Sequence, residues 1–136
     1  LDKFDRTFDF IFSCPPYYNL EVYSNDIKDL SNMDYLNFYI AYKQIITKCC
    51  KLLKNNRFAC FVVGNIRDKD GFIIDLVGIT ITLFEQCGLR FYNEIILKNQ
   101  ATTAALRADN NMTYKKVVKI HQNVLVFCKG NPKFIV

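Results

Sequence analysis

The stretch Phe8–Tyr18 constrains the fold of this chain most strongly, because an apolar run ends in it against two prolines. A short run rich in phenylalanine and isoleucine is typical of a strand covered on both faces, as in a parallel sheet. Pro15 and Pro16 lack an N–H group and fix φ, so they end the ladder, and Cys14 is held extended before them. We therefore expect a buried strand that carries a rigid loop at its carboxyl end, where ligands bind in open α/β sheets.

The sequence Ile11–Glu21 resembles the catalytic motif of the S-adenosylmethionine-dependent DNA amino-methyltransferases, in which Asp, Asn or Ser precedes Pro-Pro-Tyr. These enzymes methylate the exocyclic amine of adenine or cytosine. The lone pair of such an amine is delocalised into the ring, so two acceptors must engage its hydrogens. The resemblance implies that Cys14 and the carbonyl of Pro15 are these acceptors and that Tyr17 stacks on a flipped-out base. Pro16 completes the catalytic motif.

Cys14 departs from the family pattern, because a thiol is a weak hydrogen-bond acceptor. The alternative interpretation is a Pro-Pro turn that closes a strand, with Tyr17 and Tyr18 as ordinary surface aromatics. The apolar run directly before the motif and the order of elements after it favour the methyltransferase interpretation.

The rest of the chain alternates predicted strands and helices. After a cap at Ser31–Asp34 we expect a helix to about residue 54, a strand over 57–64, a reversal at Asp70–Gly71, a helix over 72–87 capped by Gly88, and strands over 89–97 and 121–130. Strand–helix–strand repeats imply a parallel sheet. The predicted fold class is α/β, half of a Rossmann-like methyltransferase sheet with the order β-α-β-α-β-β, and the resemblance implies that the last strand is antiparallel.

A base pocket is implied where the strand over 57–64 ends, because this strand resembles the second active-site strand of the family. Gly64, Asn65 and Tyr18 would wall this pocket. A glycine at a strand end also lets backbone approach a ligand closely. The alternative for Gly64 is a glycine that only eases the turn before the Asp70–Gly71 reversal.

Residues 98–119 are predicted to form a long basic loop, rich in Ala, Thr, Asn and Asp and carrying one acid, Asp109. Compact domains seldom keep such loops unless they are functional or disordered. The family places DNA-facing insertions here, so the resemblance implies phosphate contacts. The implied DNA-binding residues are Arg107, Lys115, Lys116 and Lys119. A flexible solvated loop is an equally good interpretation.

A chain of 136 residues with 51% apolar content is one domain at most and is small for a complete enzyme of this kind. We expect residues 1–136 to be the catalytic half of a methyltransferase. S-adenosylmethionine is the implied cofactor, but its site is expected to be incomplete, because no Phe-x-Gly-x-Gly loop occurs. The first strand is then expected to expose an edge through which the chain associates.

The cysteines, the single histidine and the hydropathy pattern indicate where the protein is located and whether it binds a metal or a membrane. The six cysteines show no C-x-x-C spacing and read as reduced, which favours a cytoplasmic protein. A single histidine argues against a metal site. No apolar run reaches membrane-spanning length, so no membrane partner is expected.

The function predicted from the motif is methylation of adenine or cytosine in DNA, as in restriction–modification systems, with base flipping and DNA as the partner. One alternative is methylation of a protein glutamine or an RNA amine by related enzymes, which mostly carry Asn where this chain has Cys14. Another is an inactive nucleic-acid-binding remnant, in which Cys14 marks a lost site.

Overall fold

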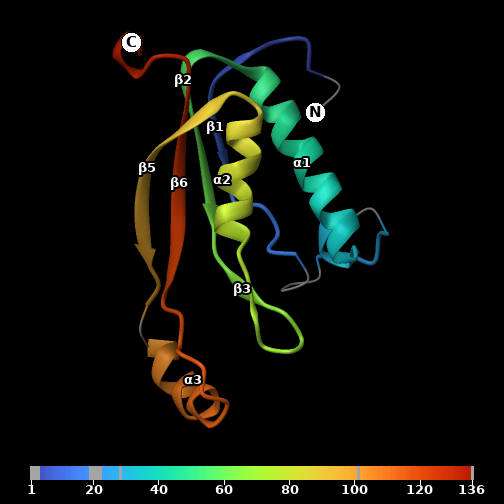
Figure 1. The fold of residues 1–136 in the computed structure, drawn as a ribbon, viewed down its shortest axis with the longest axis vertical. Helices are drawn as coiled ribbons and strands as arrows, with labels where there is room; N and C mark the ends of the chain where they lie inside the picture. The colour runs from blue at the N-terminus through green and yellow to red at the C-terminus, as the bar shows by residue number, and fades with distance from the viewer. Residues whose placement is uncertain (1–3, 19–22, 28, 101, 136) are drawn as a thin grey trace.

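The computed structural model describes residues 4–18, 23–27, 29–100 and 102–135. It is an α/β fold with one four-stranded sheet, a small two-stranded hairpin and helices on the sheet (Figure 1). The elements in chain order are β1 (Phe8–Ser13), η1 (Leu30–Asn32), α1 (Tyr35–Leu52), β2 (Leu53–Val63), β3 (Ile66–Arg67), β4 (Ile73–Ile74), α2 (Leu76–Gln86), β5 (Leu89–Lys98), α3 (Thr102–Thr113), β6 (His121–Lys129) and η2 (Pro132–Phe134).

The sheet has the order β1-β2-β6-β5, and β6, the last strand in the chain, runs against the others. β1 pairs in parallel with β2, while β6 lies between β2 and β5 and is antiparallel to both. The carboxyl ends of β1, β2 and β5 therefore share one edge, the lower one in Figure 1. This arrangement confirms the predicted α/β sheet with an antiparallel last strand.

The helix α1 starts after a cap that the sequence placed slightly too early. The Asp34 side chain accepts a hydrogen bond from the backbone N–H of Asn37 at 2.9 Å. The predicted cap residue Ser31 lies instead in η1, which is capped by Asp29. At each cap a carboxylate accepts a hydrogen bond from a free backbone N–H group. The single predicted helix start is therefore divided between the short helix η1 and the start of α1.

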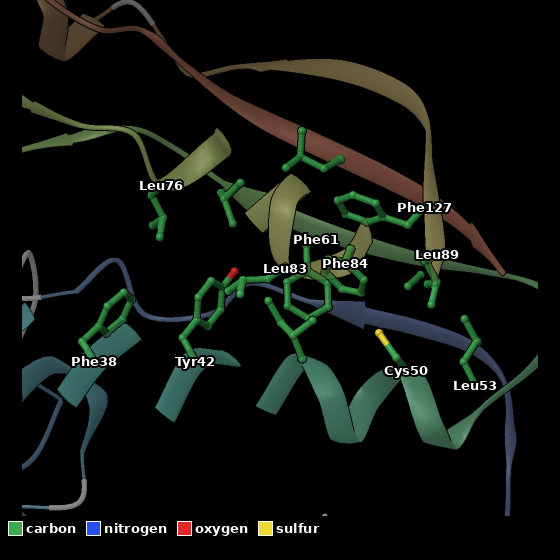
Figure 2. Packing of buried hydrophobic residues seen from close by; sticks show 14 residues of the cluster. Phe38, Tyr42, Cys50, Leu53, Phe61, Leu76, Leu83, Phe84, Leu89 and Phe127 are labelled. Carbon is green, nitrogen blue, oxygen red and sulfur yellow. The ribbon is translucent and has the colours of Figure 1, made fainter. Parts of the chain in front are cut away.

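Helices α1 and α2 pack on one face of the sheet through an aromatic core (Figure 2). Phe84 of α2 stacks on Phe127 of β6 with ring centroids 4.0 Å apart, and it meets Phe61 of β2 edge-on at 4.9 Å. Phe38 and Tyr42 bring α1 into the same cluster. Because helices and strands share these rings, the sheet cannot form its core without both helices.

The opposite face of the sheet is largely uncovered in the part of the chain that the structure describes. Phe10 and Phe12 of β1 are 56% and 63% exposed, and Ile95 of β5 is 56% exposed. Only Ile11 of β1 packs against the core. The expectation that this first strand is buried on both faces is therefore wrong. β1 is an edge strand with one covered face, since α1 and α2 both lie on the other side of these phenylalanines.

The expected long loop over 98–119 is also corrected, because most of it is helical. Lys98 ends β5, and Thr102–Thr113 form α3, which lies beyond the lower end of the sheet (Figure 1). Ala104, Ala105 and Leu106 are strong helix formers, and they outweigh the Asn and Asp residues that suggested a loop. No residue of α3 is buried. Among the helices of the described ranges, none is both long and apolar enough to cross a bilayer.

A buried hydrogen-bond chain ties α1 to α2. The Thr80 hydroxyl donates to the carbonyl of Leu76 at 2.7 Å, and the hydroxyls of Tyr42 and Thr80 are 3.0 Å apart. Since the Thr80 hydrogen is used on Leu76, the Tyr42 hydroxyl is the donor in the second bond. Both residues are fully buried, and burial raises the pKa of Tyr42.

Replacing Thr80 by valine should destabilise the fold more than replacing Tyr42 by phenylalanine. Thr80→Val leaves the Tyr42 hydroxyl buried without an acceptor, at a cost of about 1–3 kcal/mol, whereas Tyr42→Phe leaves Thr80 still bonded to Leu76. Urea unfolding of both variants measures this. The double variant should be more stable than Thr80→Val alone; if it is less stable, the assigned direction of the bond is wrong.

Candidate active site

The predicted catalytic loop docks at the carboxyl end of β1 against the neighbouring strand. Tyr17 donates its hydroxyl hydrogen to the carbonyl of Val62 in β2 at 3.3 Å. The Sγ atom of Cys14 lies 4.0 Å from the Tyr17 hydroxyl oxygen. Pro15 is buried, whereas Cys14 is exposed. The thiol of Cys14 is thus exposed to solvent, while the Tyr17 hydrogen bond holds the loop against the sheet. Residues 19–21 at the end of the motif lie outside the described residues.

The Tyr17 hydroxyl stays protonated under ordinary conditions. Burial raises the pKa of Tyr17 far above its usual range, and the neighbouring Cys14 raises it further. A neutral phenol at this position can donate a hydrogen bond but is no base near neutral pH. Tyr17 as a whole is half-buried, so part of its surface remains accessible.

Tyr18, which the resemblance placed in the base pocket, is turned toward α1. Its backbone adopts a left-handed conformation with φ of 54°. Its ring lies edge-on to Tyr35 at 5.8 Å and tilted against Phe38 at 5.3 Å. These contacts anchor the loop to the start of α1, so in this structure Tyr18 packs beneath the loop and Tyr17 alone faces the end of β2.

Gly64 and Asn65 lie where the sequence placed them, directly after β2, but they act differently from each other. Gly64 is buried beside the Tyr17 ring, and a Cβ atom on it would lie 3.8 Å from Cε2 of Tyr17. The Asn65 side chain faces away, because its Oδ1 accepts a hydrogen bond from the backbone N–H of Val77 at 2.9 Å. Asn65 therefore fixes the start of α2 and borders the site only through its carbonyl.

Lys119 completes the site from a direction that the sequence did not reveal. Its Nζ donates to the carbonyl of Asn65 at 3.0 Å and lies 2.5 Å from the point that a Cβ on Gly64 would occupy. Burial lowers the pKa of this ammonium group. We predicted Lys119 as part of a DNA-facing loop. The missed signal is that it lies two residues before an antiparallel strand, so it returns to the carboxyl ends of β1 and β2.

The other three predicted DNA-binding residues lie apart from Tyr17. Arg107 is exposed on α3, where its Nε donates to the carbonyl of Thr103 at 3.2 Å. Lys115 is exposed just after α3 with φ of 54°. Lys116 lies over the Tyr114 ring, with Nζ 5.6 Å from the ring centroid. The structure thus separates Lys119, at the end of β2, from three basic residues on α3 and directly after it.

A glycine-rich loop for the methionine end of S-adenosylmethionine is not supplied by this chain. Its glycines lie at positions 64, 71, 78, 88 and 130, so no two are closer than seven residues. Without such a loop, the residues present do not by themselves fit the whole of S-adenosylmethionine. Within the described ranges, no group of three or more His, Cys, Asp or Glu side chains is arranged to hold a metal ion.

The contact between Gly64 and Lys119 should appear as a coupling in stability. Gly64→Ala should push the lysine off the Asn65 carbonyl and cost about 0.5–1.5 kcal/mol, the value of one hydrogen bond. In a Lys119→Ala background the same change should be neutral or stabilising, because alanine then only restricts the unfolded chain. Urea unfolding of the four proteins measures this. Equal costs in both backgrounds would show that the two residues do not touch.

Comparison with known proteins gives similarity of fold at low sequence identity. The chain superimposes on the "putative DNA modification methylase" of Thermus thermophilus with a TM-score of 0.67 and 16% identity, covering 96% of this chain and 48% of that one. The same protein complexed with S-adenosyl-L-methionine gives a TM-score of 0.67 and 15% identity, covering 96% of this chain and 51% of that one. A methyltransferase from Pyrococcus furiosus superimposes with a TM-score of 0.50 and 18% identity, covering 94% of this chain and 44% of that one.

No family model matches the sequence, and no curated protein matches it. The chain spans about half the length of the solved structures that it resembles. Its α/β fold with a mixed sheet therefore matches about half of a methyltransferase structure.

Proposed function

We propose that this chain forms the amine-binding half of a DNA amino-methyltransferase. The observation that carries the proposal is the position of Cys14-Pro15-Pro16-Tyr17 at the carboxyl end of β1, docked on β2. Ligands of open α/β sheets bind at this end of the strands. The similarity to half of a methyltransferase supports the same site on grounds of fold.

In this proposal the chain holds the amine and leaves its lone pair free. Cys14 and the carbonyl of Pro15 accept the two amine hydrogens, while the ring of Tyr17 supports the flipped base. S-adenosylmethionine, when bound, supplies the electrophilic methyl group. The thiol of Cys14 accepts hydrogen bonds weakly, so one of the two amine contacts is poor. Slow methylation is the consequence, with loss of activity as the limiting case.

DNA is the proposed substrate because one basic residue lies in the site and three more precede it in the same segment of the chain. Lys119 lies beside Gly64, which also borders the Tyr17 ring, and Arg107, Lys115 and Lys116 lie on α3 or directly after it. Phosphate contacts of this kind give sequence-independent affinity for nucleic acid. A protein glutamine amide carries no such charge, which makes it the weaker candidate. An inactive nucleic-acid-binding remnant is the second candidate, favoured by the thiol at Cys14.

Restoring an oxygen acceptor at Cys14 should raise turnover. In the complete gene product, transfer of labelled methyl from S-adenosylmethionine should be slow with DNA and slower still with RNA or protein. Cys14→Ser or Cys14→Asp should speed it by up to about 10²–10³-fold, by analogy with the loss of one oxyanion-hole donor. Cys14→Ala should lower it little further, because the thiol contributes little.

The matched control for these variants is Cys87→Ser, which replaces a thiol away from the loop. It should leave the rate unchanged. Brisk methylation by the native protein together with slowing by Cys14→Ser would show that the first acceptor is assigned wrongly. Transfer to protein but not to nucleic acid would contradict the proposed substrate, and no transfer by any variant would favour the inactive remnant.

The ring of Tyr17 should matter more than its hydroxyl. Tyr17→Ala should lose stacking worth about 1–3 kcal/mol per base, whereas Tyr17→Phe gives up only the 3.3 Å bond to Val62. Relative kcat/KM for methyl transfer measures both. Tyr92→Ala, which removes a ring in β5, serves as the control and should change little. Equal losses in the two Tyr17 variants would assign the role to the hydroxyl instead.

A further inference from the structure

Lys119 is a half-buried lysine whose ammonium group has one hydrogen-bond partner among the residues that the structure describes. An ammonium group has three donors. The carbonyl of Asn65 accepts one of them at 3.0 Å. Among the described residues, no carboxylate forms an ion pair with Lys119. The group therefore retains hydrogen-bonding capacity and an unbalanced positive charge inside the site.

This arrangement is energetically costly in the free protein. Removing a charge from water without a counter-charge is unfavourable, and the lowered pKa of Lys119 reflects that cost. Lys54, by contrast, is exposed and already pairs with Asp9 at 2.9 Å. An anion that reaches Lys119 would provide the missing counter-charge and would form charge-assisted hydrogen bonds with it.

The surroundings indicate which anion the group would meet. A Cβ atom on Gly64 would lie 2.5 Å from Nζ of Lys119 and 3.8 Å from Cε2 of Tyr17, so the ammonium and the aromatic ring border the same point. The absence of a side chain at Gly64 is what makes room for the lysine there. One ligand can therefore contact both a planar aromatic surface and a cation, which suits a nucleotide with its base and its phosphate.

We propose that Lys119 binds a phosphodiester group adjoining the nucleotide whose base lies on Tyr17. This inference rests on the proposed function and adds a specific role to one residue of the site. It differs from general attraction by exposed charges, because Arg107 and Lys115 are exposed whereas Lys119 is half-buried and borders Gly64 together with Tyr17. A protein substrate with a glutamine amide would leave the charge of Lys119 unbalanced.

The test compares Lys119→Gln, Lys119→Arg and the native protein in binding a labelled single-stranded DNA oligonucleotide of mixed sequence, as the complete gene product. Glutamine keeps a donor for the Asn65 carbonyl but removes the charge. Lys119→Gln should weaken binding by about tenfold or more at low salt, the value of one hydrogen bond to a charged group. The log–log salt slope should fall by roughly 0.7, the value for one phosphate contact on a single strand. Lys119→Arg should retain most of the slope.

Lys133→Gln is the matched control, because Lys133 lies in η2 at the opposite end of the sheet and carries the same charge. It should leave affinity and slope unchanged. Urea unfolding of every variant checks that the fold is intact. If Lys119→Gln weakens oligonucleotide affinity without changing the salt slope, or if Lys119→Arg loses as much affinity as Lys119→Gln, the role of Lys119 is structural and the inference is overturned.

Two further outcomes separate this inference from the proposed function. Methyl transfer to DNA with unchanged binding by Lys119→Gln would overturn the phosphate contact and leave the function standing. Absence of oligonucleotide binding by the native protein, together with methylation of a glutamine peptide, would overturn both.

Discussion

The parallel pairing of β1 with β2 is the constraint on which the rest of the structure depends. Parallel neighbours cannot be joined by a tight turn, so the chain must cross over between them, and α1 makes this crossover. The crossover brings both carboxyl ends to the same edge of the sheet. The Pro-Pro pair then ends β1 at this edge, where the Tyr17 hydroxyl finds the carbonyl of Val62. The site is a consequence of that shared edge.

The antiparallel β6 adds the final part of the site. It runs between β2 and β5, so the segment before it returns to the edge where β1 and β2 end. Lys119 arrives there next to Gly64, which has no side chain to block it. Three segments far apart in sequence thus meet: the loop after β1, the end of β2 and the approach to β6. The aromatic contacts of Phe84 with Phe61 and Phe127 pack α2 on β2 and β6.

Much of this arrangement is readable from sequence, because local chemistry decides it. Two prolines after an apolar run end a strand whatever surrounds them, and Gly71 and Gly88 adopt the positive φ values that turns at those positions need. Residues 98–119 misled the prediction, since the helix-forming alanines of α3 are diluted by Asn and Asp. The position of Lys119 beside Gly64 could not be predicted, because it depends on which strands pair and in which register. The exposed face of β1 and the ring contacts of Tyr18 with α1 could not be predicted, because tertiary packing decides which face of a strand a helix covers.

The most direct test of the account is a ¹H–¹⁵N NMR titration of the complete gene product with a short single-stranded DNA oligonucleotide. The account predicts that the largest amide shift changes cluster at Cys14, Tyr17, Gly64 and Lys119, at the carboxyl ends of β1 and β2, with smaller changes on α3. Changes centred instead on the exposed sheet face around Phe12 and Ile95, with the Cys14–Tyr17 loop unaffected, would contradict the claim that this edge is the nucleic-acid site.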